Sequence, residues 1–107
     1  MIELLKDFLL KKGIKEQDMD VTVPEISHSY DEKDFYIANE SGSYDYDIGF
    51  YEDGLISLNV NAIISGEYDL SWDQVLIHEM CHHVLANAGL TDEAEEELCM
   101  EAETLVE

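Results

Sequence analysis

The residues with the clearest chemical potential lie in one short stretch. His78, Glu79 and His82 spell His-Glu-x-x-His, directly after the apolar run Val75 to Ile77. On a helix, side chains at positions i and i+4 lie on the same face, so the two imidazoles can bind one zinc ion between them. Glu79 would then lie beside the metal and take the proton of a zinc-bound water as a general base. The stretch predicts a zinc site with His78 and His82 as ligands and Glu79 as the catalytic residue.

The residues around this motif predict two C-terminal helices that fold back on each other. Ser71 followed three residues later by Gln74 is a capping-box pattern, so a helix is expected to begin there. It is expected to run to Ala88, with Gly89 as its C-terminal cap. Thr91 is expected to cap a second helix that continues to the end of the chain.

A catalytic zinc usually has three protein ligands and one open position, so a third ligand is expected on the second helix. If the two helices fold back near residue 90, the histidine pair faces residues near position 100. We expect Glu101 in this role because it lies at the edge of an apolar stripe formed by Ala94, Leu98, Ala102 and Leu105. Cys99, Glu97 and Glu103 remain alternatives. The simplest interpretation of any acid on this helix is a solvated charge. We expect it to hold for most of Glu93, Glu95, Glu96, Glu97 and Glu103.

The first half of the chain predicts the scaffold of the site. Helical spacing of apolar residues over positions 2–12 indicates a packing helix that ends at Gly13. From Asp20 the apolar period changes to two, which favours strands. The candidate strands cover positions 21–26, 35–37, 44–50 and 55–60, with Glu52 to Gly54 as a hairpin turn and positions 61–69 as a connecting loop.

Together these elements predict an α+β fold in a single domain, residues 1–107. It has an N-terminal helix, a small antiparallel sheet of three to four strands, and a C-terminal helical hairpin that carries the motif. One core is what a chain of this length can build.

The composition limits the partners. The chain has 26 Asp and Glu against 5 Lys and Arg, a formal net charge of -21. Such a surface is repelled by nucleic-acid phosphates and by anionic membranes, so neither is an expected partner. Two cysteines, Cys81 and Cys99, are too few for a disulfide framework, and no apolar run approaches the length of a membrane span. The acidic first residues differ from a signal peptide, and a cytoplasmic location is expected.

The stretch Val75 to His82 resembles the active-site helix of zincin metallopeptidases. With the following Glu-bearing helix, residues 70–106 are similar to the small gluzincin-type domains of phages and prophages, akin to the ImmA/IrrE metallopeptidases. The resemblance implies that His78, His82 and Glu101 bind zinc and that Glu79 is the base. It also implies a zincin-like minimal domain in which the strand nearest the site pairs with extended substrate, a role for positions 55–60.

Two functions follow as hypotheses. In the first, the chain is a zinc-dependent metallopeptidase that hydrolyses peptide bonds in a peptide or protein substrate, with activity that is weak or lost in so small a chain. In the second, it is an acidic phage-type decoy that binds a basic nucleic-acid-handling protein, and the zinc site is structural or vestigial.

The positions of four further residues predict their roles. His83 is expected to be a polar partner of Glu79, four residues before it, and not a metal ligand. His28 is interpreted as a surface residue in a loop, although His28, Tyr68 or a tyrosine of the sheet would also suit an oxyanion-stabilising position. Trp72 is expected to anchor the start of its helix by packing.

Overall fold

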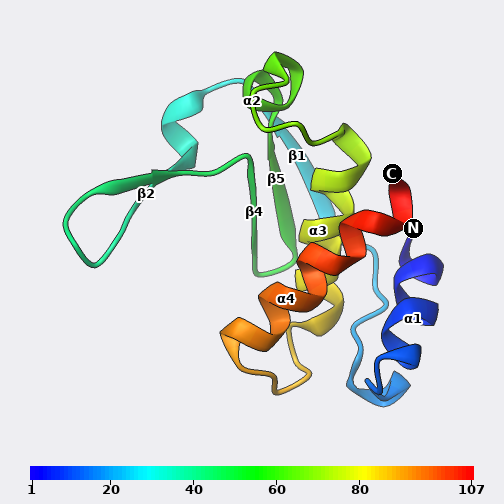
Figure 1. Cartoon of the computed structure of the whole chain (residues 1–107). Coiled ribbons are helices and arrows are strands. Elements are labelled where there is room, and N and C mark those ends of the chain that lie inside the picture. The colour runs from blue at the N-terminus through cyan, green and yellow to red at the C-terminus, as the bar shows by residue number, and fades with distance from the viewer.

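The computed structural model describes all 107 residues and has a mixed α/β architecture (Figure 1). This confirms the predicted fold class at the level of helices combined with small sheets. In chain order the helices and strands are α1 Ile2–Lys11, β1 Glu25–Ser29, β2 Tyr36–Ala38, β3 Tyr44–Tyr46, β4 Gly49–Glu52, β5 Leu55–Asn59, α2 Val60–Ser65, α3 Trp72–Leu85 and α4 Asp92–Ala102. Three short 3-10 turns lie at Glu16–Asp18, Glu32–Phe35 and Glu103–Val106.

The main sheet has the strand order β1-β5-β4. Strands β4 and β5 form the predicted antiparallel hairpin, and its turn residues Asp53 and Gly54 both have positive φ, at 46° and 83°. That pair of conformations is the tight turn whose twist matches the strands on either side. Strand β1, however, runs parallel to β5, with Glu25 opposite Leu55. The expectation of a wholly antiparallel sheet is therefore wrong, because residues 30–54 return the chain to the end of the sheet at which β1 began.

Strands β2 and β3 form a separate two-stranded antiparallel sheet that extends away from the rest of the molecule (Figure 1). The predicted single strand over positions 44–50 is divided between β3 and β4. At the break, the amide of Asp47 donates to the carbonyl of Phe35, and the side-chain amide of Asn59 donates to the carbonyl of Asp47. The backbone of Asp47 is thus paired outside the main ladder, which lets the chain change direction between the two sheets.

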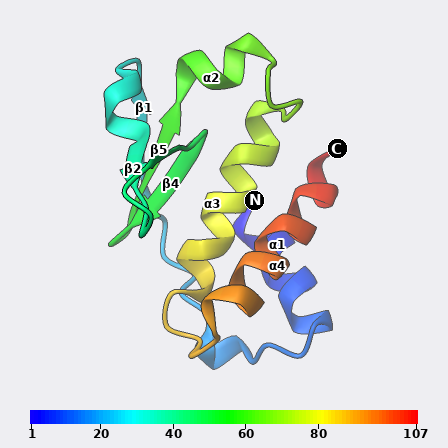
Figure 2. The ribbon, with the colours of Figure 1, turned by 60° about the vertical axis from the view of Figure 1, so that its left-hand side comes forward.

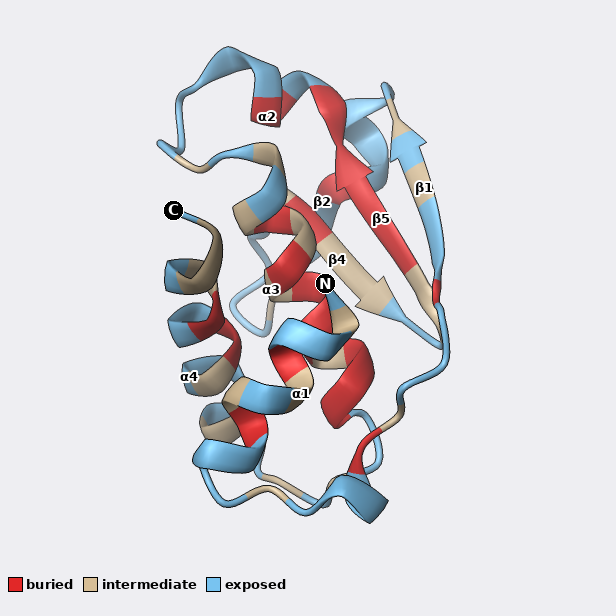
Figure 3. Cartoon of the chain, turned by 90° about the vertical axis from the view of Figure 1, so that its right-hand side faces the viewer, coloured by how far each residue is buried: buried red, intermediate tan, exposed pale blue.

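Helix α3 lies between the main sheet on one side and α1 with α4 on the other (Figure 2). Its inward residues join β5 and α1 in one hydrophobic core, which includes Leu5, Leu9, Ile56, Leu58, Ile77, Val84 and Leu85. In Figure 3 the buried colour runs along β5 and the inner turns of α3, while β1 and the outer face of α4 stay exposed. The motif helix is therefore the central element of the fold.

The ends of the C-terminal helices follow the sequence closely. The Ser71 hydroxyl accepts from the Gln74 amide and the Gln74 side chain accepts from the Ser71 amide, so the predicted capping box is present. Thr91 caps α4 as expected, whereas α3 ends at Leu85, before the expected Ala88. The predicted loop over positions 61–69 contains the short helix α2, which begins where the Asn59 side chain accepts from the amide of Ala62. None of the helices combines the length and the apolar character needed to cross a membrane.

Candidate metal centre

Two histidines of α3 and one glutamate of α4 converge on a single point. The Nε2 atoms of His78 and His82 each lie 3.1 Å from a different carboxylate oxygen of Glu96. Ligand atoms of these three residues all lie within 4.8 Å of one another. The i, i+4 spacing puts both rings on the face of α3 that packs against α4, and Glu96 reaches across from the second helix. The three side chains form a group that could hold a metal ion.

A second layer of carboxylates fixes the two rings from behind. The Nδ1 atom of His78 lies 2.7 Å from Glu103, and that of His82 lies 2.8 Å from Glu95. An ionised carboxylate only accepts hydrogen bonds, so each Nδ1 carries a proton and donates it. In a neutral imidazole the lone pair is then on Nε2, the nitrogen that faces Glu96. Outer carboxylates of this kind orient metal-binding histidines and set their tautomer.

The chemistry of this donor set fits a zinc ion. Two Nε2 lone pairs and a carboxylate meet at one point, and three acceptors without a positive charge between them repel one another. Either protons on both imidazoles or a bound cation removes that repulsion. Two histidines with one carboxylate are a known ligand set of catalytic zinc, and ligand bonds of about 2.0–2.1 Å in a tetrahedron place neighbouring donors roughly 3.3 Å apart. Each imidazole lies 3.1 Å from its own Glu96 oxygen, and the ligand atoms lie within 4.8 Å of one another, so small side-chain shifts would bring them to this spacing.

Glu79 lies beside the group on the side that faces the sheet. Its side chain is only 7% exposed and has no hydrogen-bond or ion-pair partner, yet it lines the cleft described below. Burial raises the pKa of its carboxyl above the ordinary value, an effect opposed by His78 and His82 and reinforced by Glu96 and Asp47. No fully buried polar side-chain atom lacks a partner, so the Glu79 oxygens open to the cleft, and carboxyls with a pKa raised by burial in a cleft are concentrated at functional sites.

Strand β4 approaches α3 closely because residue 49 is a glycine. A Cβ built on Gly49 would lie 3.1 Å from the carbonyl oxygen of Ser57, 3.1 Å from Val75 and 3.5 Å from Glu79. The absence of a side chain therefore lets the strand lie directly beside α3. Glu79 is held between this strand and the histidine pair.

We expect substitution of Gly49 to separate β4 from α3. Gly49→Val adds three carbons where the backbone of β5 cannot yield, and overpacking of this kind lowers the free energy of unfolding by about 2 kcal/mol. Urea denaturation followed by circular dichroism measures the change, and Gly49→Ala should give a smaller loss. Unchanged stability in both variants would show that β4 does not need this close approach.

A cleft of about 660 Å³ opens over the histidines. One wall is the chain from Asp47 to Tyr51, the floor is α3, and the other wall is the start of α4 together with Glu103. Five consecutive residues of the first wall line the cleft, whereas one face of a strand would present only alternate residues. Strand β4 therefore meets the cleft with its free edge, since its other edge pairs with β5.

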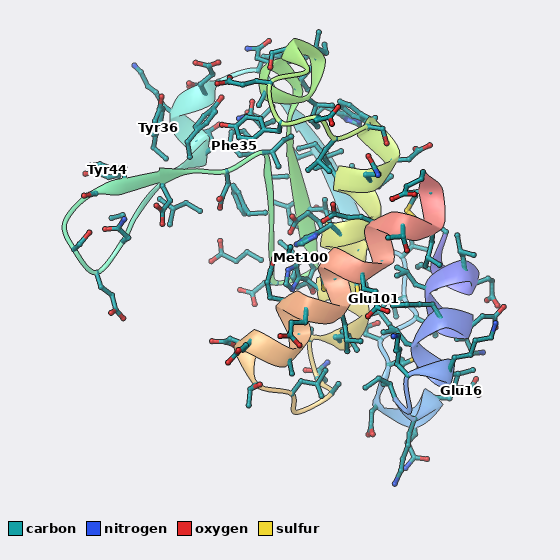
Figure 4. The ribbon with its side chains drawn as sticks, in the orientation of Figure 1. Glu16, Phe35, Tyr36, Tyr44, Met100 and Glu101 are labelled. Atoms are coloured by element: carbon teal, nitrogen blue, oxygen red, sulfur yellow. The ribbon has the colours of Figure 1, made fainter.

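The structure does not bring Glu101 to the histidines. Glu101 lies on the side of α4 that faces α1 (Figure 4), where its carboxylate pairs with Lys12, the residue after α1. Glu96 takes the place of the predicted third ligand in the group that could hold a metal. Glu97 is exposed and lies outside the cleft, and Glu103 binds the other nitrogen of His78. Cys99 is fully buried, where a hydrogen bond with the Cys81 thiol and then burial raise the pKa of its own thiol. A thiol held neutral in this way is a poor metal ligand.

Glu96 and Glu95 are the site residues that the sequence interpretation missed, because both were treated as solvated charges. The signal that identifies Glu96 is its spacing from Glu103. Glu96 and Glu103 are seven residues apart and thus share one face of a helix, as His78 and His82 do on the facing helix. Both partners of His78 therefore come from one side of the buried face formed by Cys99 and Ala102, and Glu101 lies on the other side.

The other residues singled out from the sequence have structural surroundings of their own. His83 does not bond Glu79: its Nε2 lies 2.8 Å from the carbonyl oxygen of Thr22, and its Nδ1 lies 3.0 Å from the hydroxyl of Tyr51. His28 is exposed but lies in β1, not in a loop, and stacks on Trp72 at 5.2 Å between ring centroids. Neither His28 nor Tyr68 lines the cleft, and the one sheet tyrosine that does, Tyr51, already has its hydroxyl engaged by His83 and the amide of Gly54.

Comparison of the chain with protein-family models, with curated proteins and with solved structures finds no match.

Proposed function

We propose that the protein is a zinc-dependent peptidase of the zincin type, with the metal held by His78, His82 and Glu96. The observation that carries the proposal is the convergence of these three donors next to a buried, unpartnered Glu79 at the floor of a cleft. The arrangement of α3 and α4, which presents the motif on one helix and the acid on the next, supports the zincin-like interpretation.

When bound, the zinc ion would supply a Lewis acid and lower the pKa of a water molecule towards neutrality. The side chains of the protein would transfer the proton and orient the metal ligands. Glu79 would take the proton from the attacking water and pass it to the leaving amine, and its raised pKa suits a base that must also release the proton. Glu95 and Glu103 would hold the Nδ1 protons, so that the more basic Nε2 lone pairs point at the metal and the rings stay in place.

The free edge of β4 would hold the substrate. An extended peptide can add to an exposed edge by main-chain hydrogen bonds, and β4 offers its edge along the wall of the cleft. Strand β5, which the sequence suggested for this role, lies in the centre of the sheet and has no free edge. A peptide on β4 would pass directly over Glu79.

Glu79→Gln is the test of this function. The substitution preserves shape and removes the base, so we expect peptide hydrolysis to fall by at least about 100-fold while one equivalent of zinc remains bound. Hydrolysis is measured on a library of unstructured peptides by mass spectrometry, and metal content by elemental analysis. Glu101→Gln, which neutralises an acid outside the cleft, serves as the matched control and should retain full activity.

Two results would contradict the proposal. One is wild-type protein that binds zinc stoichiometrically and cleaves nothing in the library. The other is a Glu79→Gln variant as active as the wild type. In the first case, the acidic decoy hypothesis becomes the better one, and capture of a basic partner by the metal-free protein would support it.

A further inference from the structure

The cleft contains more carboxylates than the metal centre uses. Six acidic side chains line it. Glu96 faces the two Nε2 atoms, Glu95 and Glu103 hold the two Nδ1 atoms, and Glu79 is the proposed base. The remaining two are Asp47 and Asp92, which come from different walls. Asp47 lies between β3 and β4, and Asp92 is the first residue of α4.

No positive charge in the protein offsets these two aspartates. No lysine or arginine lines the cleft. Four of the five basic residues, Lys6, Lys11, Lys12 and Lys15, lie in or next to α1 on the far side of α3, and two of these already pair with Glu16 and Glu101. Apart from the two imidazoles of the metal centre, the chain places no cationic side chain in the cleft, so a positive charge that pairs with Asp47 and Asp92 must come from outside the chain.

Asp47 has a carboxylate that no cationic side chain of the protein pairs with. Its backbone is held by hydrogen bonds with Phe35 and Asn59, and its half-buried carboxylate has no hydrogen-bond or ion-pair partner. Burial, with contributions from Asp45 and Glu96, raises the pKa of its carboxyl. It lies two residues before β4, the strand on whose edge the proposed substrate would lie. A lysine or arginine side chain from a peptide on β4 would meet Asp47 at one wall and Asp92 at the other.

We infer that the cleft selects extended peptide segments rich in lysine or arginine, with Asp47 as the main specificity-determining residue and Asp92 as the second. The inference rests on the proposed function because it assigns the substrate class of the same cleft. The half-buried carboxylate of Asp47 discriminates between a charged and a neutral side chain more strongly than the exposed carboxylate of Asp92, which ranks second for that reason. Negatively charged segments are rejected by the same residues, and this repulsion is part of the selectivity.

The test measures binding separately from cleavage. The Glu79→Gln protein, which cannot turn over, is titrated into two fluorescent decapeptides that differ only in two arginines or two citrullines, with anisotropy as the readout. Citrulline keeps the shape of arginine and removes the charge. We expect the arginine peptide to bind at least about tenfold more tightly, and Asp47→Asn to reduce that preference about fivefold.

A matched control removes the effect of overall charge. Glu40→Gln loses one negative charge, as Asp47→Asn does, but Glu40 is exposed beyond β2 and does not line the cleft. It should leave the preference for arginine unchanged. Circular dichroism verifies that each variant is folded, and Asp92→Asn provides a second variant of the cleft, with an expected loss of about threefold.

The outcomes separate this inference from the proposed function. Equal binding of the two peptides, or equal losses in Asp47→Asn and Glu40→Gln, would overturn the inference even if the wild type cleaves peptides. Preference for arginine that depends on Asp47, in a protein whose wild type never cleaves, would uphold the inference and overturn the peptidase activity. Cleavage sites of the wild type placed beside lysine or arginine would uphold both.

Discussion

Replacing Glu96 with Gln lowers the affinity for zinc by about 100-fold or more. Loss of an outer partner of a metal-binding histidine typically costs 10–100-fold, and Glu96 is the donor that faces both Nε2 atoms directly. The amide that replaces the carboxylate has no negative charge to balance the cation. Competition with a chromophoric chelator measures the dissociation constant, and Glu103→Gln, which alters only the support of His78, should lose about tenfold.

Glu101→Gln is the matched control for Glu96→Gln. Glu101 lies five residues further along the same helix, is exposed, and pairs with Lys12 instead of the histidines. Its substitution removes the same charge and should leave zinc affinity unchanged. If Glu101→Gln weakened zinc binding and Glu96→Gln did not, the ligand set would be the one that the sequence suggested.

Replacing His83 with Ala lowers the free energy of unfolding by about 3 kcal/mol without loss of zinc binding. The His83 side chain is buried and donates from Nε2 to the carbonyl of Thr22, while its Nδ1 accepts from the Tyr51 hydroxyl. The Tyr51 oxygen in turn accepts from the amide of Gly54. Alanine leaves a cavity and unpaired polar groups, and each of these costs 1 kcal/mol or more, so the combined loss is about 3 kcal/mol.

His28→Ala is the comparison for this second prediction. His28 is also a histidine in contact with an aromatic ring, but it is exposed on β1, so its removal should cost less than about 1 kcal/mol. Urea denaturation of the metal-free proteins gives both values. A His83→Ala variant that kept its stability but lost zinc would show that His83 serves the metal and does not join α3 to the sheet.

Local signals predicted the start of α3 and the hairpin turn correctly. The capping box at Ser71 and the hairpin turn at Asp53 and Gly54 depend on residues three or four positions apart, and both are present. The position of the motif on a helix followed from the same kind of local pattern. These features were predictable because their causes lie within a few residues of each other in the sequence.

The third donor was not predictable in this way, because an amphipathic helix has two edges. The buried face of α4, which is formed by Cys99 and Ala102 and not centred on the predicted apolar stripe, has Glu96 and Glu103 on one side and Glu101 on the other. Which edge faces α3 depends on where α1 packs, and Lys12 of that helix attracts Glu101 to its own side. The predicted acid was therefore wrong both in its level, by five residues along the helix, and in its rotation about the axis.

The parallel pairing of β1 with β5 has a consequence for how the chain folds. Partners such as Glu25 and Leu55 are far apart in sequence, whereas the β4 and β5 hairpin closes through a two-residue turn. Closing the long loop costs more chain entropy, so β1 should dock after the hairpin has formed. Until it does, β5 presents a second open edge made of buried residues such as Ile56 and Leu58. The docking of β1 is therefore the step that protects the nascent protein from aggregation.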